Sequence, residues 1–311
     1  MPVKKTTKLK QLIKDPKILV MPGVHDALSA KIAEKCGFEA VQCSGFGFAG
    51  SYLGIPDIGV LTLTQMVELT RNVCRAVDIP VMADGDTGFG NAVNVYYAVR
   101  DFEDAGAAGM NLEDQVFPKR CGHMAGKQII PMEEAVKKIE AAVAARRDPD
   151  FVINARTDAV AVAGVDEAIR RGNAYAKAGA DLIFVEAPTK VDDIKRVIHS
   201  IDAPVSINLL QGGRTPLVPI SQLEEWGAAR VSIPVTSIMA VAHKMFEVFS
   251  YIREHGGIAG LQDKVLSFEE FAKTVGLPEI RKLEARYLPG EEIQGRYGGE
   301  AGLQEQIKAL H

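Results

Sequence analysis

VMADGDTGFGNAVNVYYAVRDFEDAGAAGMNLED is the stretch at residues 81–114, and its pattern indicates how the chain folds. An apolar run at 81–84 leads through a turn rich in glycine and aspartate into an amphipathic segment at 92–105. A second apolar run follows at 109–113. Two short apolar runs joined by a helical segment are typical of parallel strands, because parallel strands need a long crossover connection. The stretch therefore predicts a strand, a helix and a second, parallel strand.

The same alternation of apolar runs and amphipathic segments extends along most of the chain. Candidate strands lie at 18–21, 40–44, 81–84, 109–113, 151–156, 182–186, 204–208 and 230–233. Candidate helices lie between them at 63–77, 92–105, 132–145, 165–178, 191–199 and 221–226. Eight strands that alternate with helices predict an α/β fold of the (β/α)8 TIM-barrel type, and an open doubly wound sheet is the alternative.

Both ends of the chain extend beyond this repeat. A short helix is expected at 7–14 and a pair of helices at 267–287. The last residues, 289–311, contain five glycines and mixed charges, which predict a poorly ordered tail with one terminal helix. We therefore expect a single barrel domain at 1–288, with additional N- and C-terminal helices, and a Gly-rich tail at 289–311.

Composition excludes several classes of function. The chain has 311 residues, of which 47% are apolar, and its 36 basic and 40 acidic side chains give a net charge of −4. This balance argues against nucleic acid and anionic membranes as partners. No run of 18 apolar residues and no signal-peptide core is present. The four cysteines form no Cys-x-x-Cys pair, so we expect a reduced, cytoplasmic protein.

Polar residues stand at the ends of nearly all the predicted strands. In a parallel barrel the active site lies at the carboxyl ends of the strands, so these side chains are expected to converge. Each residue alone could equally be a turn former or a helix cap, and the convergence is the informative feature. The strand-end residues are Ser44, Asp84, Asp86, Glu113, Asp114, Arg156, Asp158, Glu186 and Asn208.

The segment Asp84-Gly85-Asp86-Thr87-Gly88 is a candidate metal site. Two carboxylates two residues apart can place oxygens around a hard cation, with Glu113 or water as further ligands, and Mg²⁺ is the natural ion. An EF-hand loop is excluded because its twelfth position would fall on Val95. A helix N-terminal cap is the remaining structural alternative.

The segment Lys119-Arg120-Cys121-Gly122-His123 follows the fourth strand and can carry proton-transfer chemistry. Neighbouring cations favour the thiolate of Cys121 or make it a proton donor. A structural thiol and half of a zinc site are the alternatives, but no second Cys/His pair has ligand spacing. Gly122 and Gly126 predict a mobile lid.

The glycines of Gly45-Phe46-Gly47-Phe48-Ala49-Gly50 match the dinucleotide fingerprint by letter. The fingerprint requires a helix that opens within the glycines, whereas Pro56 follows closely and the stretch 52–59 is typical of a loop. We therefore expect these glycines to let backbone amides approach a substrate carboxylate.

Together, these motifs resemble the isocitrate lyase and phosphoenolpyruvate mutase superfamily over residues 10–290. The resemblance rests on seven segments: Ser44-Gly45-Phe46, Asp84 to Gly88, Glu113-Asp114-Gln115, Lys119 to His123, Ala155 to Ala159, Val185-Glu186-Ala187 and Gly212 to Pro216. It implies a (β/α)8 barrel, a homotetramer with an exchanged eighth helix, and a Mg²⁺-dependent site, with Mn²⁺ as a substitute. The implied substrates are 2-hydroxy or 2-oxo dicarboxylates.

The resemblance also implies roles for individual residues. Asp84 and Asp86 would hold Mg²⁺, with Glu113 in its water shell, and Ser44, Gly45, Phe46 and Arg156 would bind a carboxylate and the developing oxyanion. The Lys-Arg-Cys-Gly-His segment is similar to that of the carbon–carbon lyases, in which the cysteine protonates the departing enolate. Lys119, Cys121, His123 and Arg156 would thus be catalytic, and the remaining pocket residues would be Asp57, Gly122, Glu186 and Asn208.

Three departures from the 2-methylisocitrate lyases bear on the substrate. Met239 stands where those enzymes have an arginine for a third carboxylate, Phe268 stands near the place of a second arginine, and Gln211 replaces a common glutamate. An unpaired buried carboxylate is costly, so we expect a methyl-substituted malate such as 2,3-dimethylmalate. The alternatives are 2-methylisocitrate lyase, carboxyphosphoenolpyruvate phosphonomutase, oxaloacetate hydrolase and a non-catalytic metabolite-binding barrel.

Overall fold

Eight parallel strands close into one barrel in chain order. The computed structural model describes residues 3–122, 124 and 126–309. Its strands are β1 (Leu19–Val24), β2 (Val41–Cys43), β3 (Val81–Asp84), β4 (Gly109–Glu113), β5 (Val152–Thr157), β6 (Leu182–Val185), β7 (Val205–Asn208) and β8 (Arg230–Ile233). The predicted (β/α)8 barrel is confirmed, and the open-sheet alternative is wrong.

The register of β1 shows how the barrel closes. Leu19 lies opposite Arg230 of β8, and Gly23 lies opposite Gln42 of β2. β1 thus pairs with the last strand on one side and with its sequence neighbour on the other. No strand edge is left exposed, which removes the main route by which sheets aggregate.

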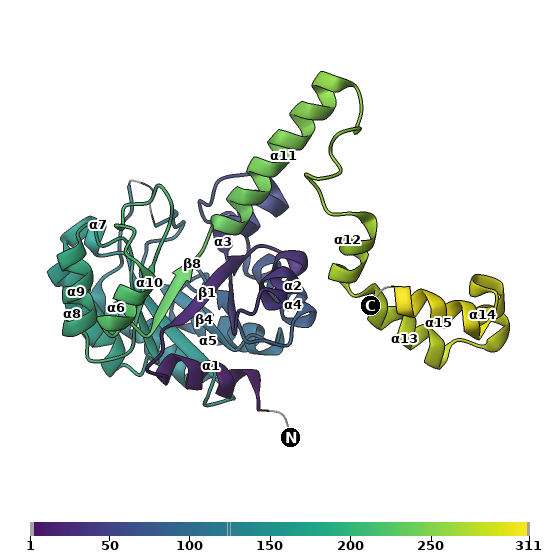
Figure 1. The fold of residues 1–311 in the computed structure, drawn as a ribbon. Coiled ribbons are helices and arrows are strands. Elements are labelled where there is room, and N and C mark those ends of the chain that lie inside the picture. Colours follow the sequence, from purple (N-terminus) through teal and green to yellow (C-terminus); the bar gives the residue numbers. More distant parts are fainter. Residues whose placement is uncertain (1–2, 123, 125, 310–311) are drawn as a thin grey trace. The chain divides into compact units, whose positions relative to one another are not determined.

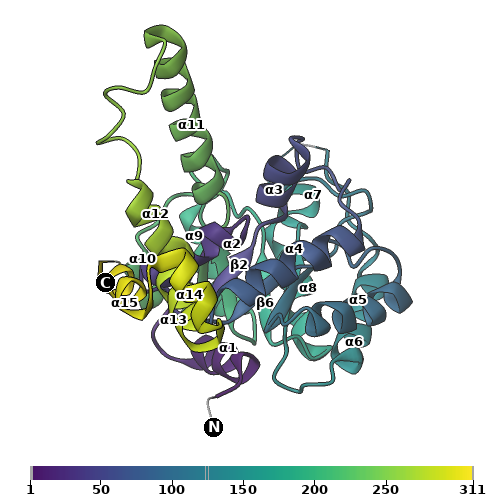
Figure 2. The ribbon, with the colours of Figure 1, turned by 90° about the vertical axis from the view of Figure 1, so that its right-hand side faces the viewer.

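Helices surround the barrel and connect its strands (Figure 1). Figure 2 shows α5 next to α6, which packs against it. Capping boxes start several helices where the sequence leaves a strand, as at Asp26, Thr62 and Asn91. The helices that follow the strands are α2 (Ala27–Lys35), α4 (Leu63–Ala76), α5 (Ala92–Asp104), α6 (Met132–Ala145), α8 (Val165–Lys177), α9 (Val191–Ser200), α10 (Ile220–Glu225) and α11 (Thr236–His255).

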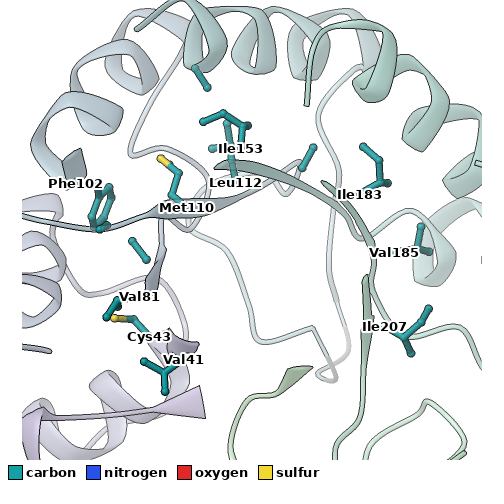
Figure 3. Close-up of a cluster of buried hydrophobic side chains, with 14 of the residues drawn as sticks. Val41, Cys43, Val81, Phe102, Met110, Leu112, Ile153, Ile183, Val185 and Ile207 are labelled. Carbon is teal, nitrogen blue, oxygen red and sulfur yellow. The ribbon is translucent and has the colours of Figure 1, made fainter. Parts of the chain in front are cut away.

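The main hydrophobic core lies between the strands and these helices. Alternate strand residues such as Val41, Cys43, Ile183 and Val185 are fully buried there, and their side chains point away from the barrel interior (Figure 3). Because side chains alternate along a strand, the residues between them, such as Gln42, face the interior. Because apolar residues occupy the outward-facing positions of each strand, the alternate residues face the interior and can reach the site.

The barrel interior is apolar at its amino end and polar above it. Leu9 and Ile13 of α1 (Lys5–Lys14) close the amino end against Leu19, Met21 and Met82. The polar layer above is unusual, since barrel interiors are normally filled by branched apolar residues. It consists of the buried residues Gln42, Asn111, Asn154, Ser206, Arg230 and Ser232.

The chain divides into two compact units, residues 1–241 and 242–311. Within the second unit, the predicted pair of trailing helices is present as α12 (Phe268–Val275) and α13 (Leu277–Tyr287). The structure also places α14 (Gly290–Tyr297) and α15 (Glu300–Ala309) where the glycines predicted a poorly ordered tail. Ile293, Leu303 and Ile307 form a small core there, and glycines 298 and 299 lie in the turn between the helices. The predicted division at residue 288 stays a prediction.

None of the helices in the described ranges combines the length and the apolarity needed to cross a bilayer.

Candidate active site

A cleft lies at the carboxyl ends of the strands. Eleven residues singled out from the sequence line it, namely Ser44, Gly45, Phe46, Asp57, Asp84, Lys119, Cys121, Gly122, Arg156, Glu186 and Asn208. Asp86 and Glu113 are buried beside them and contact Lys119 and Arg156. His123 lies outside the described residues. The expected convergence of strand-end residues is therefore present for all the described candidates except Asp114 and Asp158.

These two aspartates are buried behind the cleft wall. Asp114 accepts hydrogen bonds from Thr157 and Tyr175, both at 2.7 Å, and pairs with Arg171 at 3.0 Å. It also accepts from the backbone N–H of Asp158. Asp114 thus fixes the end of β5 from outside and holds Asp158 beneath Arg156.

β2 ends in a tight turn that brings backbone amides to the cleft. The sequence predicted that no helix opens within these glycines, which is wrong, because α3 (Gly45–Phe48) begins there with Ser44 as its N-cap. This helix is only one turn long and continues into a π-helical turn at Ala49–Leu53. The Gly45 N–H donates to Asp84 Oδ2 at 2.8 Å, and a Cβ at Gly45 would lie 2.7 Å from the same oxygen. Only glycine allows this approach.

An acidic cluster with one ammonium group occupies one side of the cleft. Lys119 Nζ lies 2.7 Å from a carboxylate oxygen of Asp57 and 2.8 Å from Asp86 Oδ1. Burial raises the pKa of Asp86 to about 7, although the Lys119 charge opposes this. Burial opposes the charge of Lys119, but Asp86 and Asp57 outweigh it and raise the lysine pKa well above its ordinary value. Asp86 also has a φ of 44°, a strained conformation of the kind that collects at functional sites.

The carboxylates of this cluster fit a hard divalent cation. Glu113 Oε1 is buried and has no hydrogen-bond partner among the described residues, and burial raises the pKa of Glu113 well above its ordinary value. Asp84 Oδ2 and Asp86 Oδ1 lie 2.7 Å and 3.6 Å from the Cβ position that Gly45 lacks. Among the described residues no three side chains have direct metal-ligand geometry. Mg²⁺ usually takes only one or two carboxylates and keeps several waters, so the set suits that ion.

Arg156 is the central cation of the opposite side. It lies 3.2 Å from Glu113 and 3.3 Å from Glu186, and its Nε donates to Asp158 Oδ2 at 2.8 Å. Burial opposes its charge, but these carboxylates outweigh burial and raise the pKa of Arg156 well above its ordinary value. Its guanidinium also lies 5.3 Å from the ring centre of Phe184. Arg156 is thus held in place and charged, as binding a carboxylate requires.

The segment that carries Cys121 is fixed to the cleft by its backbone. The Cys121 N–H donates to the carbonyl of Asp57 at 3.1 Å, and Lys127 Nζ donates to the carbonyl of Gly122. Lys127 also pairs with Asp158 Oδ1 at 2.8 Å. A Cβ at Gly122 would lie 2.6 Å from Arg156 Nη2, so this glycine rests directly on the arginine. The predicted mobility of this lid stays a prediction.

Sequence reasoning missed several residues of the site. Gln42, Asn111, Phe184, Leu210, Pro234 and Val235 also line the cleft. Gln42 and Phe184 could have been found from strand alternation, because each lies two residues before a strand-end candidate. Met239 is 43% exposed and is not one of the residues lining the cleft in the described part of the chain.

Comparison with known proteins shows which family this chain is similar to. Residues 9–253 match the model of the phosphoenolpyruvate phosphomutase family. The chain is 44% identical to 2,3-dimethylmalate lyase of Eubacterium barkeri over 91% of this chain and 98% of that protein. It is 41% identical to 2-methylisocitrate lyase of Aeropyrum pernix over 93% of each chain.

A solved structure of phosphonopyruvate hydrolase in complex with oxalate and Mg²⁺ has the same fold. Its TM-score is 0.84 and its sequence identity 35%, over 92% of this chain and all of that one. The family match covers most of the barrel, and the relatives it is similar to are enzymes. The chain belongs to the phosphoenolpyruvate phosphomutase family, in the PEP mutase/isocitrate lyase superfamily of enzymes.

Proposed function

We propose that this protein is a carbon–carbon lyase that cleaves 2,3-dimethylmalate, or a close 2-hydroxy dicarboxylate, to pyruvate and propionate. One observation carries the proposal: Cys121, a potential proton donor, lines the same cleft as Arg156 and the carboxylates Asp84 and Glu186. A carboxylate-binding cation and a proton donor in one cleft are the two functions that a retro-Claisen cleavage needs.

In the proposed reaction, Arg156 and the backbone amides after β2 bind the carboxylate next to the 2-hydroxyl. The hydroxyl gives its proton to a carboxylate of the cleft, and the C2–C3 bond breaks. The electron pair moves to C3 and forms an enolate of the departing acid, which the Cys121 thiol protonates. The electron pair of the former O–H bond forms the C2=O bond of the 2-oxo acid, and the other product is a monocarboxylate. The proton taken up by the cleft carboxylate then passes to the Cys121 thiolate through solvent, which restores both groups for the next cycle.

Asp84, Asp86 and Glu113 are the residues that would hold Mg²⁺, and Mn²⁺ is proposed as a substitute. When bound, the ion lowers the pKa of the substrate hydroxyl and stabilises negative charge on its oxygen. The support is the buried Glu113 Oε1, which has no hydrogen-bond partner in the described part of the chain, and the oxygens of Asp84 and Asp86 near Gly45.

The lining of the cleft favours a small apolar substituent over a third carboxylate. Leu210, Pro234 and Val235 contribute apolar surface, and the cationic lining residues in the described ranges are Lys119 and Arg156. A third carboxylate would have to be buried against this apolar wall without a partner, which is costly. Two methyl groups would instead be favourably buried, each by roughly 1 kcal/mol.

The test is the release of a 2-oxo acid from a substrate panel, measured by coupled reduction with and without Mg²⁺. The panel contains 2,3-dimethylmalate, 2-methylisocitrate, isocitrate, citramalate and oxaloacetate. Metal-dependent pyruvate from 2,3-dimethylmalate, and little from 2-methylisocitrate, is the expected result. Preferential cleavage of 2-methylisocitrate would overturn the proposed substrate, and no product from any compound would favour phosphorus–carbon chemistry of the carboxyphosphoenolpyruvate type.

We further propose a homotetramer in which the eighth helix, α11, is exchanged between subunits. α11 is 20 residues long, and the described residues of the single chain bury none of its side chains. Phe246 and Phe249 are 76% and 60% exposed, and apolar patches of this kind mark protein interfaces. Light scattering after gel filtration should give a tetramer for the wild type and a smaller species for Phe246→Asp. A wild-type monomer would contradict the proposal.

The location in a reducing cytoplasm also stays a proposal. It is supported by four cysteines that form no disulfide with one another.

A further inference from the structure

A fully buried arginine lies directly beneath the cleft without an acidic partner. Arg230, at the start of β8, has no exposed surface, and no carboxylate pairs with it among the described residues. Its Nε has no hydrogen-bond partner in the same part of the chain. Burial lowers the pKa of Arg230, to about 9, which leaves the group charged at neutral pH. Such a charge is costly to bury, so a compensating function is expected.

The Arg230 guanidinium is held by uncharged groups across the barrel. Its Nη2 donates to Gln42 Oε1, and its Nη1 lies 3.0 Å from the sulfur of Met82. When the Asn154 amide is oriented to donate to the Leu182 carbonyl, its oxygen accepts from the same Nη1 at 2.9 Å. β8 and β2 are not neighbours in the sheet, so the contact with Gln42 runs through the barrel interior.

The contact with Arg230 fixes which half of the Gln42 amide faces the cleft. Gln42 lines the cleft, two residues before Ser44 on the same strand. Because Oε1 accepts from Arg230, the group that remains for a ligand is the amino group Nε2. That group is not hydrogen-bonded to any of the described residues. A glutamine in this orientation can only donate.

We propose that Gln42 is a substrate-binding residue that donates a hydrogen bond to a carboxylate of the ligand, and that Arg230 is the positioning residue that orients it. The inference rests on the proposed function, because it assumes a dicarboxylate in this cleft. Carboxylates outnumber cations around the cleft, so a second anion is repelled unless donors and buried positive charge offset them. Arg230 supplies such a charge without presenting a hydrogen-bonding group that competes for the substrate.

The experiment measures ligand binding directly, so its result does not depend on whether the protein turns over a given substrate. Binding of oxalate and of succinate to the full-length protein is measured by titration calorimetry with saturating Mg²⁺. Gln42→Glu keeps the size and the contact with Arg230 but replaces the donor by an anionic acceptor. Gln42→Leu removes both the donor and the oxygen that accepts from Arg230. Ser206→Ala is the matched control, since Ser206 is buried in the same polar layer but does not line the cleft.

We expect Gln42→Leu to weaken the binding of at least one of the two ligands about tenfold, as loss of a charge-assisted hydrogen bond does. Gln42→Glu should weaken it further, and Ser206→Ala should stay within twofold. In turnover, Gln42→Leu should raise KM by a similar factor with little change in kcat, the signature of a lost binding contact.

Arg230→Met should reduce ligand affinity by less than Gln42→Leu does, because the Gln42 amide is kept but can then rotate. If that variant fails to fold, the two Gln42 variants and the control still decide the matter. Unchanged affinity for both ligands in Gln42→Leu would overturn the inference. Failure of the wild type to cleave 2,3-dimethylmalate would overturn the proposed substrate but not this binding result.

Discussion

Gly122→Ala tests whether the Cys121 segment must rest on Arg156 for activity. A Cβ at residue 122 would lie 2.5 Å from Glu186 Cδ and 2.6 Å from Arg156 Nη2. Ordinary van der Waals contact begins near 3.4 Å, so either the segment or the arginine must move by about 1 Å. Both belong to the proposed machinery, and neither can move without displacing a reacting group.

The expected cost follows from this displacement. A misplacement of about 1 Å at an active site can reduce the rate by about 100-fold, which corresponds to about 2.7 kcal/mol of transition-state stabilisation. Gly122 is buried against Glu186 and Arg156, so the added methyl group also overpacks the site and should cost roughly 1 kcal/mol or more of folding stability. We therefore expect kcat/KM for pyruvate release to fall about 100-fold while the melting temperature falls by only a few degrees, so that the variant stays folded at the assay temperature.

Gly50→Ala is the matched control. A Cβ at Gly50 would meet no atom within 4 Å, so neither activity nor stability should fall. Pyruvate release by both variants is measured in the same coupled assay, and their thermal unfolding is measured by circular dichroism. Activity of Gly122→Ala within threefold of the wild type would refute the view that the segment is seated on Arg156 and Glu186 during catalysis.

Four further predictions concern the same cleft. Lys127→Met removes the hydrogen bond to the Gly122 carbonyl, so kcat should fall about tenfold. Cys121 should also be alkylated faster by iodoacetamide, as measured on its peptide by mass spectrometry. An unchanged alkylation rate would contradict the proposed role of this hydrogen bond. The charges of Arg156 and Lys127 outweigh burial and hold the pKa of Asp158 at about 2, below its unfolded value near 3.8. About 2 kcal/mol of folding stability is therefore present above pH 4 and is lost as the pH falls from 4 to 2. Urea unfolding should show this loss in the wild type and not in Asp158→Asn. Cys121→Ser should abolish turnover but leave Mg²⁺-dependent oxalate binding intact, and full activity would remove the thiol from its acid role. Met239 does not line the cleft but lies one helical turn beyond Val235, which does, so the longer side chain of Met239→Arg should reach the cleft and raise turnover of 2-methylisocitrate; no change would discredit the argument from the missing arginine.

The sequence predicts the barrel well because its signals are local. Apolar runs of four to six residues, helix caps and turn glycines each act within a few positions, and the starts of β3, β4, β6 and β8 agree with the predicted ones. The C-terminal segment is where this reasoning fails. Glycines at 298 and 299 were interpreted as disorder, whereas they allow the turn between α14 and α15, which pack through Ile293 and Leu303.

The site was predictable where strand order alone brings residues together. Asp84, Arg156 and Glu186 each follow a strand, and parallel topology places them around one cleft. Lys127 and Arg230 were not predictable in this way. Lys127 reaches the site through a carbonyl contact, and Arg230 reaches it across the barrel interior, so both depend on tertiary geometry that no local pattern encodes.

The two missed cations help to explain how an acid-rich cleft can accept an anionic substrate. Asp57, Asp86 and Glu113 are all buried near one another, and their mutual repulsion disfavours a further carboxylate. Arg156 alone cannot offset this, since its guanidinium already faces Glu113 and Glu186. A divalent cation on the acidic side, together with the buried charge of Arg230 under the floor, would restore the balance. On this view the substrate dicarboxylate should bind weakly before the metal and tightly after it, since each charge added to the acidic side removes repulsion that the substrate would otherwise meet.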